Sequence, residues 1–213
     1  NFDQKNDIVY FDKGQLSFFP QLENGEFQQT KSMVPLKMKV SDKDWWEQES
    51  DDGEGIDQSK IDHQRLYQIK DLNNDGLADI ITIHNKNSGV FNQVNDYEIY
   101  FGKKLNAELT FPEQPDNVIH SDGTQFDLQF LDLNDDKIEE VFVSAVDIGI
   151  SQIIGALLTG SIDQDVHFFR MKNNHGYPKK ANLSRETEIK FSLSSGTQSP
   201  SVLKVADFDG DGF

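Results

Sequence analysis

A short run of alternating oxygen-bearing side chains constrains this chain more than any other feature. It extends from residue 71 to residue 79 and carries, at its first, third, fifth and ninth positions, Asp71, Asn73, Asp75 and Asp79. A tight loop of this kind can bring short carboxylates to one point, and Ca²⁺ takes about six to eight oxygen ligands. Gly76 stands where the loop must turn sharply, and glycine adopts a positive φ without steric cost. The run therefore predicts a calcium loop, with the Leu77 carbonyl as a further ligand.

The same run could instead be a polar turn, because Asn, Asp and Gly are favoured in turns by their local hydrogen bonds. Its recurrence favours the loop. Residues 132–140 repeat the spacing with Asp132, Asn134, Asp136 and Glu140, and residues 207–213 repeat it with Asp207, Asp209 and Asp211. A copy without its first position opens the chain, with Asn1, Asp3 and Asp7. Unrelated turns would not keep this register.

The loops alternate with runs that predict β-strands. Apolar runs follow the loops at residues 8–11, 80–83 and 141–143, and alternating runs precede them at residues 66–70, 126–130 and 202–205. The residues two and four before each loop are apolar and should share one strand face, in the pairs Ile69 with Tyr67, Phe130 with Leu128, and Val205 with Leu203. Each loop is therefore expected to join two strands.

A further strand is expected later in each repeat, at residues 16–19, 98–102 and 156–160, followed by a polar turn and an aromatic residue, Phe27, Phe111 or Phe168. The repeats then comprise about residues 1–70, 71–131 and 132–206, with the start of a fourth at 207–213. Insertions at 41–60 and 171–200 are expected to be surface loops. Trp45 and Trp46 in the first insertion could stack on a sugar or protein, or fold onto the rim of the domain.

Strand, D-x-[DN]-x-[DN]-G-x-x-D loop, strand, and then a strand that ends in Phe101-Gly102 resemble the FG-GAP repeat of integrin α-subunit propellers and the related VCBS repeats of bacterial surface proteins. The resemblance covers the whole chain, 1–213, as one propeller segment. It implies an all-β fold, a β-propeller fragment of about three blades, with calcium in the loop between adjacent strands of a blade.

The resemblance implies particular metal ligands. For one ion they are Asp71, Asn73, Asp75, the Leu77 carbonyl and Asp79, and for a second they are Asp132, Asn134, Asp136, the Ile138 carbonyl and Glu140. The second loop departs from the pattern, because Lys137 stands at the glycine position and must adopt an uncommon positive φ or reshape the turn. Asp207, Asp209 and Asp211 lack a closing ligand in this sequence, and Asn1, Asp3 and Asp7 lack an opening one.

Three blades cannot close a ring, because propellers have typically four to eight. We therefore expect the sequence to be cut from a longer chain, with an oligomer that completes the ring as the alternative. A larger assembly is compatible with both.

Composition excludes some classes of partner. The 37 acidic and 20 basic residues give a net charge of −17, which argues against nucleic acid and against adhesion to anionic membranes by charge. There is no cysteine, and hence no disulfide or thiolate site. No apolar run is long enough for a membrane span, so no membrane insertion is expected of this segment.

These features predict a non-catalytic, calcium-stabilised binding or adhesion module, extracellular or at the cell surface, with the periplasm as a further possibility. Its partner would be a protein or glycan held at a rim. The five histidines show no H-E-x-x-H spacing, and the chain has no G-x-S-x-G or Walker motif. The alternative is the propeller scaffold of a secreted polysaccharide-degrading enzyme. An EF-hand or dockerin-like module is disfavoured, because position 12 of the loops is Thr82 or Val143 rather than Glu.

Overall fold

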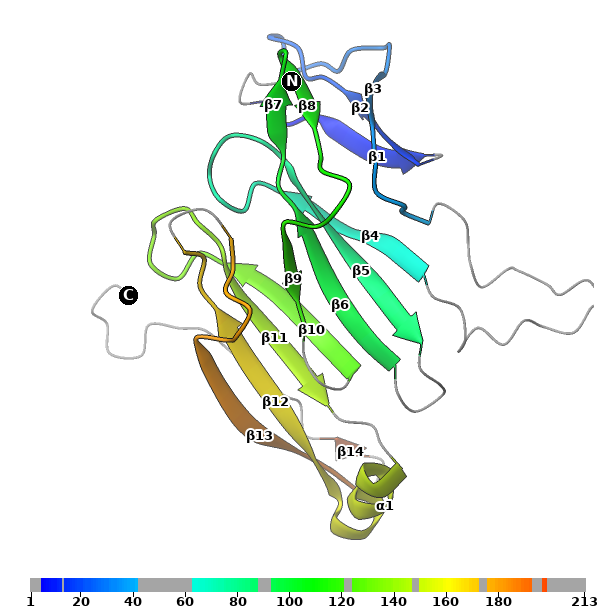
Figure 1. Cartoon of the computed structure of the whole chain (residues 1–213), viewed down its shortest axis with the longest axis vertical. Coiled ribbons are helices and arrows are strands. Elements are labelled where there is room, and N and C mark those ends of the chain that lie inside the picture. Colours follow the sequence, from blue (N-terminus) through cyan, green and yellow to red (C-terminus); the bar gives the residue numbers. More distant parts are fainter. Residues whose placement is uncertain are drawn as a thin grey trace, which may run out of the picture. The chain divides into compact units, whose positions relative to one another are not determined.

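The chain forms two compact units made almost entirely of antiparallel β-strands (Figure 1). The computed structural model describes residues 5–12, 14–41, 63–87, 93–120, 124–146, 150–172, 176–192 and 197–198. One unit comprises Asn1–Lys86 and Asp96–Ile119, and the other comprises Asn87–Asn95 and His120–Phe213. The predicted all-β class is confirmed. The sheets are small and open, and none of them closes on itself within the described residues.

The first unit contains three sheets. A three-stranded sheet has the order β1-β2-β3, formed by Ile8–Asp12, Gln15–Phe19 and Ser32–Pro35. A four-stranded sheet has the order β4-β5-β6-β9, formed by His63–Lys70, Asp79–Asn87, Gln93–Tyr100 and Asn117–Ile119. A hairpin of β7 (Lys103–Leu105) and β8 (Glu108–Thr110) lies between β6 and β9 in the chain. These strands include all those predicted for residues 8–11, 16–19, 66–70, 80–83 and, up to Tyr100, 98–102.

A hydrophobic core joins the two larger sheets of this unit. It comprises side chains from both sheets and from the segments that follow β3 and β8, namely Leu16, Val34, Met38, Val40, Ile80, Tyr100 and Phe111. Ile80 is fully buried, and Phe111, the predicted aromatic after the turn, is 3% exposed. Burial of large apolar side chains contributes about 1.5–3 kcal/mol each, so this core fixes β5 and therefore the loop that precedes it.

The second unit contains one sheet of order β10-β11-β12-β13-β14, whose first four strands are neighbours in Figure 1. Its strands are Thr124–Leu131, Glu140–Val146, Ser161–Phe169, Leu183–Ser192 and Thr197–Gln198. Val141, Val143 and Phe169 are buried in it. β10 and β11 confirm the strands predicted around residues 126–130 and 141–143. β13 falls inside residues 171–200, so the prediction that this whole insertion is a surface loop is wrong.

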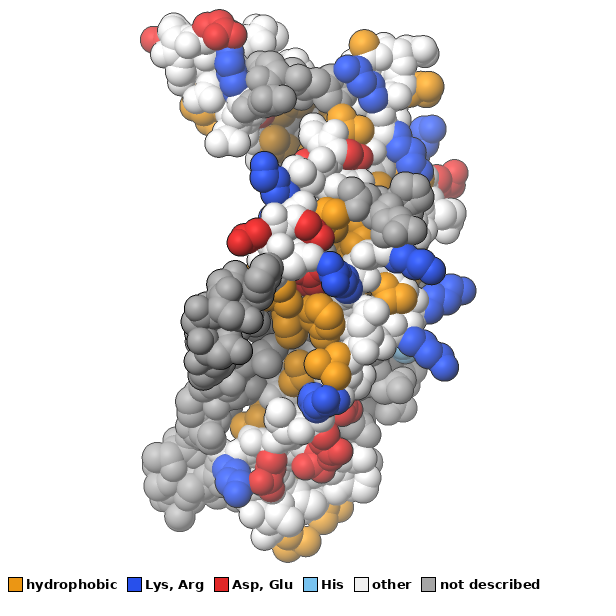
Figure 2. Space-filling view, turned by 90° about the vertical axis from the view of Figure 1, so that its left-hand side faces the viewer, with side chains coloured by type: hydrophobic (Ala, Val, Ile, Leu, Met, Phe, Trp, Pro, Cys, Tyr) orange, Lys and Arg blue, Asp and Glu red, His pale blue; other side chains and the backbone are white. Residues whose placement is uncertain are grey.

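Residues 156–160, expected to form a strand, belong instead to the end of helix α1 (Ile150–Thr159) and its cap. An apolar run cannot be assigned to helix or strand by its periodicity alone. Gly160 ends the helix with φ of 73° and donates its N–H to the Ala156 carbonyl at 2.8 Å. The helix packs against β12, buries Ala156, and leaves Leu158 82% exposed. Figure 2 shows hydrophobic side chains at its lower end, where Figure 1 has α1.

The third repeat has its strand in β12, later than the predicted residues 156–160. The aromatic residue predicted to follow that strand is therefore also misplaced. Phe168 lies within β12, so its prediction as the aromatic after the turn is wrong. After β12, Lys172 donates its N–H to the Gly176 carbonyl, and Tyr177, directly after Gly176, is 5% exposed. Tyr177 is thus a buried aromatic residue after β12, as Phe111 is after β8.

The predicted shared face of Tyr67 and Ile69 is also wrong, because β4 has a bulge between Leu66 and Gln68. The bulge adds one residue and reverses the alternation of side chains. Leu66 and Ile69 therefore both pack on the core, whereas Tyr67 is 40% exposed and contacts the Tyr97 ring edge-on at 5.2 Å. The Leu128 and Phe130 pair of β10 has a regular register and shares a face as predicted. Leu203, Val205 and the Trp45-Trp46 pair lie outside the described residues.

Candidate metal loops

Two loops of the predicted pattern occupy the same place in two different sheets. The first loop, residues 71–79, connects β4 to β5, and the second loop, residues 132–140, connects β10 to β11. In both cases the two strands are antiparallel neighbours, with Lys70 opposite Asp79 and Leu131 opposite Glu140. The prediction that each loop joins two strands is confirmed for both.

The first loop is held by its own polar side chains. The Asp71 carboxylate accepts the N–H of Asp75 at 3.2 Å and that of Gly76 at 2.9 Å. The Asn73 Oδ1 atom accepts the N–H of Asp75 at 3.1 Å, and Asp75 Oδ1 accepts the N–H of Leu77 at 2.8 Å. Asn73 Nδ2 donates to Asp75 Oδ2 at 3.1 Å. The alternate side chains therefore all turn toward the inside of the loop.

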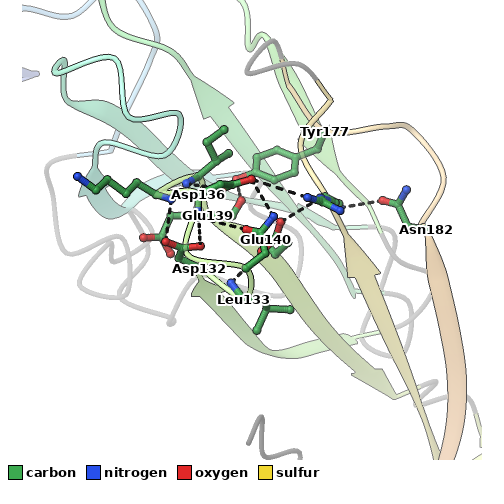
Figure 3. A network of polar contacts seen from close by, with 11 residues as sticks. Asp132, Leu133, Asp136, Glu139, Glu140, Tyr177 and Asn182 are labelled. Atoms are coloured by element: carbon green, nitrogen blue, oxygen red, sulfur yellow. Dashed lines mark hydrogen bonds and ion pairs between the residues drawn. The ribbon is translucent and has the colours of Figure 1, made fainter. Parts of the chain in front are cut away.

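The second loop repeats this set bond for bond, and Figure 3 shows Asp132 and Asp136 in its network of polar contacts. Asp132 accepts the N–H groups of Asp136 (3.2 Å) and Lys137 (2.8 Å), and Asn134 Oδ1 lies 3.4 Å from the N of Asp136. Asp136 Oδ1 accepts the N–H of Ile138 at 2.9 Å, and Asn134 Nδ2 donates to Asp136 Oδ2 at 2.8 Å. Two sequences with different residues at most intervening positions thus adopt one loop conformation.

The backbone dihedrals agree with this equivalence. Gly76 has φ of 81°, as predicted from its position, and Lys137 at the corresponding position of the second loop has φ of 64°. The residues that stand fourth in each loop, Asn74 and Asp135, also have positive φ, 55° and 56°. A lysine in this region is uncommon and strained. The second loop therefore keeps the conformation of the first loop at a cost in backbone energy.

The closing carboxylates are buried and connect each loop to its sheet. Asp79 is fully buried and its Oδ2 accepts the N–H of Leu72 at 2.8 Å. Glu140 is 1% exposed and its Oε2 accepts the N–H of Leu133 at 3.0 Å. The longer Glu side chain therefore reaches the same backbone position as the Asp of the first loop.

In two sheets the closing acid also contacts the chain just after a neighbouring strand, β6 for Asp79 and β2 for Asp7. Asp79 Oδ1 accepts the N–H of Gly102, two residues after β6 ends, at 2.9 Å. Asp7 Oδ1 accepts the N–H of Gln21, two residues after β2 ends, at 3.0 Å. Asp7 thus makes the contact expected of a closing acid. Asn1, Asp3, Asp207, Asp209 and Asp211 lie outside the described residues.

Glu140 differs from the other two closing acids in its partner. Its Oε1 lies 3.4 Å from Nε of Arg170, the residue directly after β12. Nη2 of the same guanidinium lies 3.8 Å from Oδ2 of Asp136. The second loop therefore has a cationic side chain beside it, and no sequence spacing pointed to Arg170.

A pair of hydrogen bonds that the sequence did not predict, called the strand-end tie below, connects the end of one strand to the start of its neighbour in two sheets. Asp116, directly before β9, accepts the N–H of Phe101 at 2.9 Å and donates its own N–H to the Ile99 carbonyl at 2.9 Å. Asn182, directly before β13, does the same with the N–H of Arg170 (2.7 Å) and the Phe168 carbonyl (2.8 Å). In the first sheet Lys31 stands directly before β3 and Pro20 directly after β2, and proline has no N–H that needs an acceptor.

Burial governs the electrostatics of the closing acids. It raises the pKa of Asp79 from its ordinary value of 3.8 to about 7, against the N–H groups of Leu72 and Gly102, and the carboxylates of Asp75 and Asp71 raise it further. Burial also raises the pKa of Glu140. In contrast, the side-chain amide of Asn134 lowers the pKa of Asp136. The first loop thus holds a buried carboxyl group that other carboxylates make harder to ionise.

The donor set suits a hard cation in its chemistry. Each ionised carboxylate has about four lone-pair sites, and the two N–H groups on Asp71 occupy only part of its capacity. The acids of the first loop are near enough to shift the pKa of Asp79 by charge. Within the described residues, however, no three His, Cys, Asp or Glu side chains converge enough to hold an ion as they stand. Binding would therefore require these inward-facing side chains to move closer together on an already folded loop.

A separate polar network lies on β4, β5 and β6. Gln64 Nε2 lies 2.8 Å from Thr82 Oγ1 and 2.7 Å from Glu98 Oε2, and the Tyr100 hydroxyl donates to Glu98 at 2.7 Å. His84 Nδ1 lies 2.9 Å from Glu98 Oε1. Burial raises the pKa of Tyr100 above its usual range. This network connects polar side chains of three adjacent strands.

No helix in the described part of the chain is long and apolar enough to cross a membrane. A search of protein-family models, of curated proteins and of solved structures found no match to this chain.

Proposed function

We propose that this chain is a segment of a calcium-stabilised β-propeller that serves as an extracellular, non-catalytic binding or adhesion module. The observation that carries the proposal is the equivalence of the two loops. Residues 71–79 and 132–140 share their internal hydrogen bonds, their positive-φ positions and their place between the first two strands of a meander. Unrelated polar turns would not be expected to agree in all of these details.

The repeated ties support the interpretation of each repeat as a propeller blade. β4-β5-β6-β9 is a four-stranded antiparallel meander, and β10-β11-β12-β13 repeats it as the first four strands of the five-stranded sheet. β1-β2-β3 has the last three strands of the same pattern. Propellers consist of such four-stranded blades around an axis. A complete ring would require further blades, from a longer chain or from other copies.

In the first loop calcium would be held by Asp71, Asn73, Asp75, the Leu77 carbonyl and Asp79. Bound calcium supplies a positive charge that offsets the repulsion among these carboxylates and the burial of Asp79. Extracellular calcium modules have Kd values of about 10⁻⁴–10⁻³ M, and at ten times Kd one filled site adds about 1.4 kcal/mol of stability. A site of that affinity would be filled outside the cell and empty in the cytosol.

The first experiment is thermal unfolding of the full chain in calcium and in EDTA, with the metal content determined on the same sample. We expect a higher melting temperature in calcium. Asp75→Ala should lower the bound calcium by one ion, because Asp75 is both a ligand and the acceptor of the Leu77 N–H. Asp163→Ala is the matched control, since Asp163 is an exposed acid on β12. Equal melting curves with no bound metal would contradict the calcium proposal.

The partner class requires a separate experiment. Immobilised glycans and extracellular matrix proteins can be screened in calcium and again in EDTA, and calcium-dependent retention without chemical change of the ligand is the expected result. The same samples can be assayed for release of reducing sugar from polysaccharides. Release that Asp75→Ala abolishes would replace the binding function with the propeller scaffold of a polysaccharide-degrading enzyme.

A further inference from the structure

The second loop has a cation of its own within the fold. The guanidinium of Arg170 lies 3.4 Å from Glu140 and 3.8 Å from Asp136, two of the acids predicted to bind metal there. The side chain of Glu140 is only 2% exposed, whereas that of Arg170 is 56% exposed. Figure 3 shows Asp132, Asp136 and Glu140 close together in this network. The positive charge therefore faces the acids from the solvent side.

The position of Arg170 is set by its backbone. Its N–H donates to Asn182 Oδ1 at 2.7 Å, so the residue is fixed between the end of β12 and the start of β13. The guanidinium fork is planar and carries several N–H donors, which allows it to approach two carboxylates at once. Lysine, a compact point charge on a flexible stem, would not make the same pair of contacts.

The first loop has no such cation at the corresponding position. Phe101 stands there, directly after β6, and the second oxygen of Asp79 meets the neutral N–H of Gly102 instead. The pKa of Asp79 is set mainly by burial, by N–H groups and by carboxylates, and not by a cation. The two loops therefore share a conformation but differ in how their negative charge is balanced.

We propose that Arg170 is the resident counter-cation of the second loop, so that this loop keeps its fold without calcium and binds calcium more weakly than the first loop. This inference rests on the proposed calcium function and deepens it. Calcium and the guanidinium compete for Glu140 and Asp136, and calcium must displace Arg170 to enter. Contacts of an exposed guanidinium are individually weak, so the competition lowers the affinity without preventing binding.

The test compares Arg170→Met with Arg185→Met in the full chain. Methionine keeps much of the length of the side chain but removes the charge. Arg185 is an exposed arginine on β13 whose guanidinium donates to the Ser184 carbonyl, so its loss changes the net charge by the same amount away from the loop. Asp71→Ala and Asp132→Ala identify which measured affinity belongs to which loop.

In calcium titrations we expect two affinities in the wild type, with the weaker one removed by Asp132→Ala. Arg170→Met should tighten the weaker affinity about fivefold relative to Arg185→Met, the scale of one weak ion pair. In EDTA the same variant should lower the unfolding midpoint more than Arg185→Met does, and calcium should restore the difference.

The outcomes separate this inference from the proposed function. Suppose that calcium binds, but that Arg170→Met and Arg185→Met have equal effects on the weaker affinity and on the unfolding midpoint in EDTA. This result would overturn the role of Arg170 and leave the calcium loops intact. A failure of all variants to bind calcium would remove both the proposed calcium function and the competition assigned to Arg170.

Discussion

The carboxylate of Asp79 accepts the backbone N–H of Gly102 at 2.9 Å, across 23 residues of chain. Asp79 is the first residue of β5 and Gly102 follows the end of β6, so one buried side chain connects the loop to the far end of the hairpin. Asp7 and Gln21 form the corresponding bond at 3.0 Å in the first sheet. The closing acid of the loop is therefore a structural residue even before any metal binds.

Gly102→Ala should destabilise the first unit, because an added Cβ would lie 2.4 Å from the Ala78 carbonyl oxygen. The backbone cannot relax there without weakening the bond to Asp79. Overpacking of this kind costs about 1–3 kcal/mol. Urea unfolding measures the change. Gly155→Ala in α1 is the control, since its Cβ would meet nothing within 4 Å and alanine favours helix by about 1 kcal/mol. Equal effects of the two substitutions would contradict the close approach.

The pKa of Asp79 predicts how stability varies with pH in the metal-free protein. Because the pKa is about 7 in the folded chain and 3.8 ordinarily, the folded state binds the extra proton between these values. Stability from this group is therefore present at low pH and falls as the pH rises from about 4 to about 7.

Unfolding in EDTA at a series of pH values checks this, with Asp79→Asn as the comparison. The variant should lose the fall between pH 4 and pH 7 that the wild type shows, because its side chain does not titrate. Saturating calcium should flatten the wild-type profile in the same range, since a bound cation favours the ionised carboxylate. Parallel profiles for the two proteins would contradict the raised pKa.

Lys137→Gly should leave stability unchanged or raise it by up to about 1 kcal/mol, because glycine has no steric cost at a φ of 64°. Lys172→Gly is the control. Its φ is not positive, so glycine there only adds freedom to the unfolded chain and should destabilise by up to about 1 kcal/mol. Chemical denaturation of both variants, which remove the same charge, gives the comparison; a larger loss for Lys137→Gly would refute the strain.

The strand-end tie predicts that alanine substitutions at Asp116, Asn182 and Lys31 lower stability by decreasing amounts. Asp116→Ala leaves the partly buried N–H of Phe101 without its acceptor and should cost about 1–3 kcal/mol. Asn182→Ala affects the exposed N–H of Arg170, which water can reach, and should cost less. Lys31→Ala removes no acceptor, because Pro20 has no N–H. It removes the contact of Lys31 Nζ with the exposed Tyr10 ring, 5.8 Å from the ring centre, and should cost no more than about 0.5–1 kcal/mol. Thermal melts rank the three; the opposite order would show that the equivalence has no energetic meaning.

Local sequence was sufficient for the features that depend on neighbouring residues. The loops were predictable because the spacing of Asp, Asn and Gly determines which backbone N–H groups the side chains can reach. Most of the flanking strands were predictable from their apolar and β-branched runs. For Lys137, its alignment with Gly76 left two alternatives, a positive φ or a reshaped turn, and the structure has the positive φ.

Residues 156–160 and Tyr67 were mispredicted because their conformation depends on the tertiary structure. The apolar run of α1 suits either a helix or a strand, and packing against β12 decides for the helix. The bulge in β4 places Tyr67 on the strand face opposite to the one that simple alternation predicts. One extra residue in the strand causes this change, and the periodicity of the sequence does not reveal it.

The sequence by itself determined the conformation of the loops, because their hydrogen bonds close within a few residues. Only the tertiary structure decided what each closing acid contacts. Asp79 meets Gly102 and Glu140 meets Arg170, partners that are distant in sequence and are brought into reach by the pairing of β5 with β6 and of β11 with β12. Strand pairing sets these distances, and with them the charge balance of each loop.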